Sequence, residues 1–286
     1  MPMSSYEFGD RPFDVEDLVI ISNDILAVGV PFDTDAKFRS MIMAAMQTYL
    51  LRNKSIDNIY RKYGRKLEER LKPDKEIQLV RSMTSTVKKL TRQELKKIWD
   101  LDLSDHLGLF ASQAALIRLQ ATIRSAIMLI HFGFHYESAS IMRMILEQLA
   151  WVYKIHSMVD DQIFAIKPSK CINDLKKIFP KVGKIYGSFS ESAHIELEKT
   201  RQYVHVTDES VTIKFTTTEH SPYDAYALLS LADIYISMIE IVFADYLKNF
   251  KHTVKHNQER LPKASRPIQA VRNRYWKLIS KQVKKT

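Results

Sequence analysis

The stretch that decides the fold is residues 107–156, which read LGLFASQAALIRLQATIRSAIMLIHFGFHYESASIMRMILEQLAWVYKIH. Its first half, to about His131, places apolar residues three or four positions apart, as an amphipathic helix does. Gly133 interrupts this pattern, and a second helical run begins at about Tyr136. Because the connection is so short, the spacing predicts an antiparallel pair of packed helices.

The composition agrees with a helical protein that has a real core. Hydrophobic residues make up 45% of the 286 residues and charged residues 27%, which excludes wholesale disorder. Seven Gly are too few for a turn-rich sandwich or barrel, and the single Cys171 excludes a disulfide framework. Residues 211–216 alternate and are rich in β-branched side chains, which predicts a short strand. We therefore expect an all-α helical bundle with a minor β-hairpin or short strand and a basic C-terminal helix.

Three regions are predicted along the chain. Residues 1–100 form an N-terminal helical extension, residues 101–250 form the bundle, and residues 251–286 form a basic linker and an amphipathic helix. The last helix of the bundle is expected to run to about Phe250, with two acids on its polar side, Asp233 and Glu240.

Most of the net charge of +10 lies at the C-terminal end. Residues 248–286 hold eight Lys and four Arg against one acid, so this tail carries +11 and the rest of the chain −1. A basic amphipathic helix can bind phosphates, lie on an anionic membrane, dock on a partner, or pack on its own fold with a solvated face. As a nucleic-acid surface, with RNA favoured over DNA, it would use four side chains: Arg272, Arg274, Lys277 and Lys281.

Neither helix of the central pair is expected to cross a membrane. Arg124, His131, His135, Arg143 and Glu147 would be costly at the centre of a bilayer. The chain also opens without the pattern of a signal peptide. We therefore expect a cytoplasmic protein with no transmembrane segment.

A first polar stripe lies on the helix predicted for residues 136–156. Ser140, Arg143, Glu147 and Lys154 follow one another at spacings of three, four and seven, so they share a face. Arg143 and Glu147, four residues apart, can form an ion pair. The pair either satisfies itself at the edge of the helix or, beside the wide apolar face, holds a neighbouring group or an anionic ligand.

A second polar stripe has the groups that acid–base chemistry needs. Tyr186, Ser190, His194, Arg201 and His205 lie within a sector of about 100° if residues 181–205 form one helix. A hydroxyl, an imidazole and a guanidinium on one side suit proton transfer next to a phosphate. The alternative is a surface helix that happens to carry polar residues. In the functional interpretation this stripe faces Arg143 and Glu147 across adjacent helices and forms one cleft with them.

Arg124 and His131 form a third pair, seven residues apart on the first helix, and are either binding groups or satisfied structural groups. The chain has no P-loop, dinucleotide fingerprint, nucleophile elbow or zinc-protease motif. Its nine His are scattered without a ligand-like pattern. We therefore expect neither a cofactor nor a metal.

Two segments resemble a family of uncharacterised bacterial all-helical proteins that combine an Arg-x-x-x-Glu helix with a Tyr-x-x-Leu-Ser-x-x-x-His segment. The first segment comprises Arg124–Ala126, Gly133–Ala139 and Met142–Glu147, and the second is Tyr186–His194, with Phe189 at the Leu position. The resemblance covers roughly residues 107–250. Residues 1–100 and the basic tail lie outside it.

That family is distantly similar to the HEPN superfamily of helical bundles. The resemblance implies a dimeric, metal-independent endoribonuclease of a toxin–antitoxin or antiphage defence system, acting through an Arg-x(4–6)-His motif. Here Arg201 and His205 are separated by three residues, one fewer than the motif requires. Arg124 and His131 have the required separation, but the residue after the Arg is Ser125 instead of Asn, Asp or His.

The leading expectation is RNA or nucleotide binding, with cleavage as its enzymatic form. In that form His194 or His205 is the general base, Arg143 or Arg201 holds the phosphate, and Glu147 orients its Arg. The alternative is a non-catalytic interaction module that docks on a partner enzyme, encoded nearby, or on its nucleic acid. A homo-oligomer is expected in either case.

Overall fold

The computed structural model describes residues 18–22, 26–31, 34–52, 55–71, 75–193, 204–206, 210–213, 216, 220–257 and 259–283. Within these residues the chain is mainly helical, and its strands form two-stranded antiparallel hairpins. The predicted fold class, all-α with a minor β element, is confirmed. The chain divides into two compact units, Ser4–Gln78 and Leu79–Thr286.

The smaller unit combines a β-hairpin with two helices. Its described elements are β1 (Leu18–Ser22), β2 (Ala27–Pro31), α1 (Ala36–Leu50) and α2 (Ile56–Arg70). Asp35 caps α1 by accepting a hydrogen bond from the Phe38 N–H at 2.6 Å. Ile21, Val30 and Met46 form the small core between the hairpin and α1. The hairpin was not expected in a helical extension.

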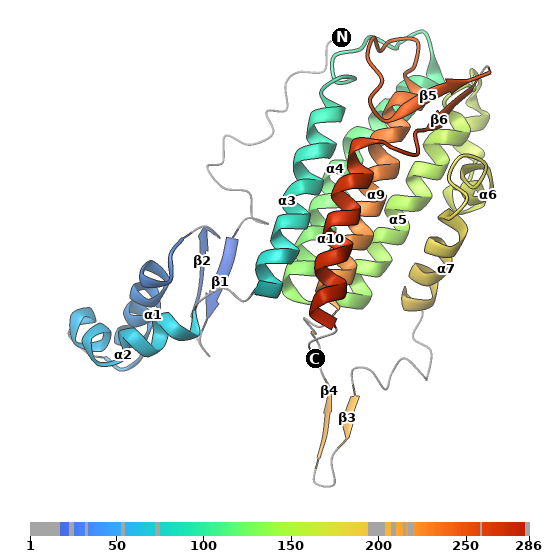
Figure 1. Cartoon of the computed structure of the whole chain (residues 1–286). Helices are drawn as coiled ribbons and strands as arrows, with labels where there is room; N and C mark the ends of the chain where they lie inside the picture. Colours follow the sequence, from blue (N-terminus) through green and yellow to red (C-terminus); the bar gives the residue numbers. More distant parts are fainter. Residues whose placement is uncertain are drawn as a thin grey trace. The chain divides into compact units, whose positions relative to one another are not determined.

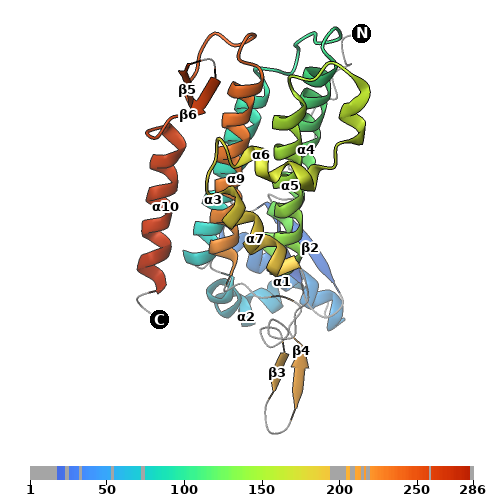
Figure 2. The same ribbon diagram turned by 90° about the vertical axis from the view of Figure 1, so that its right-hand side faces the viewer.

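The larger unit is a bundle of long helices (Figure 1). They are α3 (Lys75–Leu95), α4 (Leu107–Phe132), α5 (His135–Ile155), α9 (Ser221–Val242) and α10 (Pro267–Val283). Helix α9 contacts α4, α5 and α10, and α10 lies on the outside of the bundle (Figure 2). The side chains of α3 from Leu79 onwards join the main core, so the bundle begins earlier than the residue 101 expected from the sequence.

The helical pair predicted for residues 107–156 is present as α4 and α5. Gly133 ends α4 with a φ of 75°, in the left-handed region that glycine adopts without strain. Helix α5 begins two residues later and packs along α4. The predicted interruption at Gly133 is therefore the turn of an antiparallel helical hairpin.

Helix α9 has no polar side, contrary to what the sequence suggested. Asp233 and Glu240 are 1% and 0% exposed, and the helix ends at Val242, before Phe250. Both carboxylates are buried because later segments of the chain supply their hydrogen bonds. The sequence did not indicate that these acids are buried, because the groups that hydrogen-bond to them lie far along the chain.

Shorter elements complete this unit: the 3-10 helices η2 (Asp161–Ala165) and η3 (Pro168–Cys171), helices α6 (Ile172–Leu175) and α7 (Val182–Ala193), and strands β3 (Val204–Val206), β4 (Val211–Ile213), β5 (Thr253–His256) and β6 (Glu259–Pro262). The strand predicted at 211–216 is present over its first three residues, as β4. The region interpreted as a linker contains β6, which pairs with β5. The single helix expected over 181–205 is wrong, because His205 lies in β3 opposite Thr212.

Two helices are long and apolar enough to cross a membrane when judged by length and composition alone. They are Leu107–Phe132 and Ser221–Val242. In the most apolar window of each helix, 39% and 83% of the residues, respectively, are buried inside the protein. The core helices of soluble proteins meet the same criterion.

Candidate functional site

Three of the predicted site residues meet between α5 and α7. Arg143 Nε donates to Glu147 Oε1 at 3.0 Å, and one terminal nitrogen of Arg143 donates to the Tyr186 hydroxyl at 3.0 Å. Tyr186 in turn donates its hydroxyl hydrogen to Glu147 Oε1 at 2.8 Å. The contact expected across adjacent helices therefore exists for these three side chains, which form a closed triangle.

The triangle is partly shielded from water. The side chains of Arg143 and Glu147 are 28% and 20% exposed, and the guanidinium carbon lies 5.2 Å from the centre of the Tyr186 ring. Burial lowers the pKa of Arg143, but its hydrogen bonds to Glu147 and Tyr186 outweigh this and leave the pKa above its usual value. The guanidinium is therefore a fixed positive charge held in one orientation.

Within the described residues, no other member of the second polar stripe forms a hydrogen bond with this triangle. Ser190 lies on α7, and its buried hydroxyl has no hydrogen-bond partner there. His194 and Arg201 lie outside the described residues, as does the side chain of His205. Of the residues predicted to line a shared cleft, the structure brings together Arg143, Glu147 and Tyr186.

The third predicted pair lies elsewhere in the bundle. His131 Nε2 is 2.9 Å from the Thr84 hydroxyl of α3, so this imidazole links α4 to α3. Arg124 is half-buried on the same helix.

The basic C-terminal helix packs on the bundle through one buried acid. Asp233 accepts hydrogen bonds from Arg266 at 2.5 and 2.7 Å, from Gln269 at 2.8 Å and from Arg272 at 2.8 Å. Three apolar side chains of α10 are buried against the fold: Ile268, Tyr275 and Ile279. Arg272, predicted as a nucleic-acid contact, therefore has a structural partner in Asp233.

The other three predicted contacts of α10 face solvent. Arg274, Lys277 and Lys281 are exposed and follow one another at spacings of three and four, so they share one face of the helix. The helix contains no acid, and no ion pair joins these three cations to any described residue. Trp276 is exposed on a different side of the helix, with its ring tilted against Tyr226 at a centroid distance of 5.2 Å.

A histidine–aspartate pair missed by the sequence analysis joins the N-terminal ends of α5 and α9. His135 Nδ1 lies 2.8 Å from Asp224 Oδ2, and the ring of His220 stacks on His135 at a centroid distance of 4.5 Å. A carboxylate in this position fixes the imidazole tautomer and its orientation. The His and Asp are 89 residues apart in sequence, so no local spacing could have indicated the pair.

One buried cluster has the residue types of a metal site. Potential ligand atoms of Glu94, Glu240 and His252 lie within 4.8 Å of one another. Glu240 already accepts the backbone N–H groups of residues 251–253, and the Lys97 ammonium contacts Glu94 and lies 4.0 Å from Glu240. Burial raises the pKa of Glu94, but interactions with His252 and Lys97 outweigh this and leave it below its usual value. The ammonium supplies the positive charge that a metal would otherwise provide.

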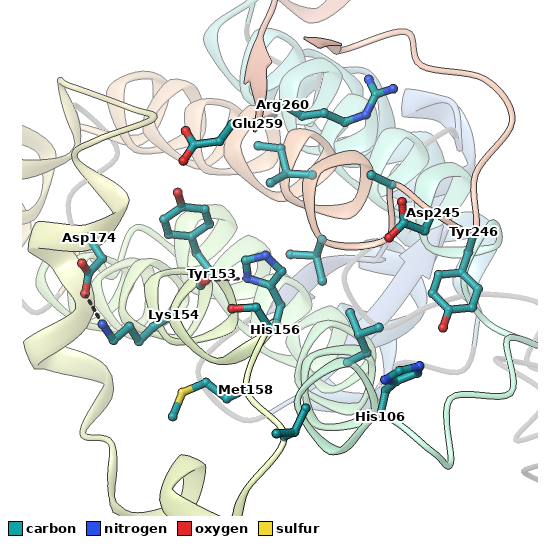
Figure 3. Close-up of a pocket in the computed structure, with 16 residues that line it drawn as sticks. His106, Tyr153, Lys154, His156, Met158, Asp174, Asp245, Tyr246, Glu259 and Arg260 are labelled. Atoms are coloured by element: carbon teal, nitrogen blue, oxygen red, sulfur yellow. Dashed lines mark hydrogen bonds and ion pairs between the residues drawn. The ribbon is translucent and has the colours of Figure 1, made fainter. Parts of the chain in front are cut away.

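A cavity of about 620 Å³ lies at the opposite end of the bundle from His135, where α5 and α9 end. Figure 3 shows Tyr153 and His156 at its centre, with Glu259 and Asp245 on two sides of them. Leu109, Ile241 and Val242 supply apolar lining. No local spacing in the sequence could have indicated this cavity, because its residues come from five separate segments of the chain.

Comparisons with known protein families, curated proteins and solved structures found no match. Function must therefore be inferred from the residues of this chain. Two arrangements suit an anionic ligand: the fixed guanidinium of Arg143 and the solvent-facing cations of α10. Of these two arrangements, the cations of α10 form a row of three charges on a helix without acids, whereas Arg143 is a single charge that is paired with Glu147 on its own helix.

Proposed function

We propose that this protein binds RNA, or a nucleotide, and that the exposed face of α10 supplies the principal contacts. The observation that carries the proposal is the solvent-facing row of Arg274, Lys277 and Lys281 on a helix without acids. Such cations release counterions from a phosphate backbone when they bind it, which is the main source of sequence-independent affinity. Asp233 supports this role by fixing the helix on the bundle.

Single-stranded RNA suits this face better than a duplex. Trp276 of the same helix is also exposed, and an indole offers a surface on which an unpaired base can stack. A cationic groove combined with a stacking aromatic ring is the usual arrangement for binding single strands. We therefore expect unpaired RNA to bind more tightly than duplex DNA of the same length.

The binding test uses fluorescently labelled single-stranded RNA and a triple variant, Arg274→Gln/Lys277→Gln/Lys281→Gln. The variant should bind more weakly and reduce the slope of log affinity against log salt by about 2, as expected for three lost phosphate contacts. The matched control, Lys167→Gln/Lys170→Gln/Lys184→Gln, removes three exposed charges elsewhere and should bind normally. Equal salt slopes for the two variants would exclude α10 as the binding face.

Cleavage is the enzymatic form of this proposal. The resemblance to HEPN-like bundles suggests a metal-independent endoribonuclease of a toxin or antiphage system, in which Arg143 would hold the scissile phosphate. What supports this role is that Arg143 is oriented by Glu147 and Tyr186 and remains partly exposed. His194 or His205 would then take the proton of the ribose 2′-hydroxyl.

An incubation with total RNA in EDTA tests cleavage. Wild-type protein is compared with His194→Ala, His205→Ala and Arg143→Gln. Cleavage that survives EDTA and disappears in these variants would support the nuclease. If wild-type protein binds the RNA but leaves it intact, the protein is an RNA-binding protein without nuclease activity.

A non-catalytic interaction module is the second candidate. It is favoured by the closed triangle of Arg143, Glu147 and Tyr186, whose hydrogen bonds satisfy one another without a ligand. Leu278 is also exposed on α10, as expected of a helix that docks on another protein. Under this candidate, Leu278→Ser abolishes co-purification with a partner encoded nearby but leaves the affinity for RNA unchanged.

A further inference from the structure

The cavity beside Tyr153 and His156 carries an inference independent of RNA binding. It is lined by the first turn of α4, the ends of α5 and α9, Asp174 of α6, and β6. Its volume of about 620 Å³ lies within the range of small-molecule sites in proteins. The chemistry of its lining indicates what it would bind.

The imidazole of His156 faces the cavity as a hydrogen-bond acceptor. Its Nδ1 lies 2.6 Å from the backbone carbonyl oxygen of Tyr153. Because a carbonyl oxygen can only accept, Nδ1 carries the hydrogen and Nε2 keeps its lone pair. Burial lowers the pKa of His156, which favours this neutral form at physiological pH.

The basic side chains at the cavity are already engaged. Lys154 Nζ lies 3.4 Å from Asp174 Oδ2. The guanidinium of Arg260 stacks over the ring of Phe250 and donates to the Thr253 hydroxyl at 3.4 Å. In Figure 3 the guanidinium points away from the cavity. Neither side chain offers a free positive charge to a ligand.

Two acids at the cavity have no such partner. Asp245 and Glu259 are exposed, and no described basic residue forms an ion pair with either. Tyr153 responds to this negative field, because burial and the charge of Glu259 raise the pKa of its hydroxyl. The free groups of the cavity are therefore mainly acceptors, together with the faces of Tyr153 and Tyr246.

This set of groups excludes some ligand classes. A phosphate would be repelled by two unpaired carboxylates. A compact metal site needs ligand atoms close together, and among the described residues only the Glu94, Glu240 and His252 group meets that condition. A ligand with two separate cationic groups would match acids that lie on two sides of His156 (Figure 3).

We propose that the cavity binds a small linear di- or polyamine. One terminal ammonium group pairs with Asp245 and the other with Glu259, and in a polyamine such as spermidine the N–H of the inner nitrogen donates to His156 Nε2. The tyrosine rings pack against the alkyl chain and stabilise the positive charge. This site is separate from the exposed face of α10 and uses none of its residues.

Isothermal titration calorimetry of the full chain without RNA tests the proposal. Spermidine and putrescine should bind with a stoichiometry of one, whereas 1,4-butanediol and inorganic phosphate should not. Asp245→Asn and Glu259→Gln should each weaken binding of spermidine about tenfold, because each removes one charge-assisted contact. Both positions are exposed, so we expect the variants to fold.

Glu137→Gln is the matched control, since it removes an exposed acid at the other end of α5. It should bind spermidine as the wild type does. Absence of amine binding, equal binding by the diol, or equal weakening by Glu137→Gln would each overturn the proposal. None of these outcomes bears on the affinity of α10 for RNA, so the two proposals can fail separately.

Discussion

Asp233 of helix α9 and Arg266, which precedes α10, form a bidentate ion pair, with nitrogen–oxygen distances of 2.5 and 2.7 Å. The carboxylate is almost fully buried, and Arg272 donates to the same oxygen as Arg266 at 2.8 Å. This pair connects the neutral body of the protein to its basic tail. It also explains why an acid is tolerated in the middle of a buried helix.

Asp233→Asn is expected to destabilise the protein by about 3 to 5 kcal/mol, because two half-buried guanidinium groups lose the buried carboxylate that is their counter-charge. The free energy of unfolding in urea measures the loss, and limited proteolysis should show earlier cutting near α10. Arg274→Gln serves as the control, since this exposed side chain does not touch Asp233, and its effect should stay within about 0.5 kcal/mol. Equal stability of Asp233→Asn and wild type would show that the tail is held by its apolar contacts.

Gly108 is expected to tolerate no side chain. A Cβ at this position would lie 2.2 Å from the Ile155 carbonyl oxygen and 2.4 Å from that of Met158, and both obstacles are backbone atoms. Gly108→Ala should therefore cost about 1 to 3 kcal/mol of stability, as overpacking does. Gly187→Ala is the matched control, because nothing lies within 4 Å of its Cβ, and in a helix it should be neutral or stabilising. Thermal denaturation of the two variants measures the contrast, and a Gly108→Ala melting temperature at or above that of Gly187→Ala would contradict it.

The helical pair and the contact between Arg143 and Tyr186 could be predicted because both depend on local periodicity. Apolar spacing defines the faces of α4 and α5, and Gly133 marks the turn between them. Arg143 and Glu147 lie four residues apart on α5, so they share a face, and Tyr186 reaches them because α7 packs against α5. The periodicity of the sequence predicts which residues share each of these faces.

The buried acids of α9 could not be predicted in this way. Asp233 and Glu240 have the spacing of a polar face, but the groups that satisfy them come from residues 251–272, beyond the helix. The β5–β6 hairpin was missed for a similar reason, since its turn uses Asn257 at a φ of 54° without the glycine that usually marks such turns. Both features depend on long-range partners or on an uncommon turn.

Tyr186→Phe tests whether the triangle acts as a unit. Removal of the hydroxyl deletes the hydrogen bonds to Arg143 and Glu147 and should cost about 1 kcal/mol of stability. A double-mutant cycle with Glu147→Gln should give a coupling energy of about 0.5 kcal/mol or more, because the two side chains share one hydrogen bond. If the two substitutions change the free energy of unfolding in urea additively, the triangle does not act as a unit.

His156 is expected to make stability depend on pH. Burial holds its pKa below the ordinary value of 6.5, so the unfolded chain binds a proton more readily than the folded one. The contribution of His156 is fully present above about pH 6.5 and decreases as the pH falls from there towards the lowered folded pKa. His156→Asn, which keeps a donor for the Tyr153 carbonyl, should flatten this part of the profile of unfolding free energy against pH. A slope that survives His156→Asn would assign the pH dependence to another group.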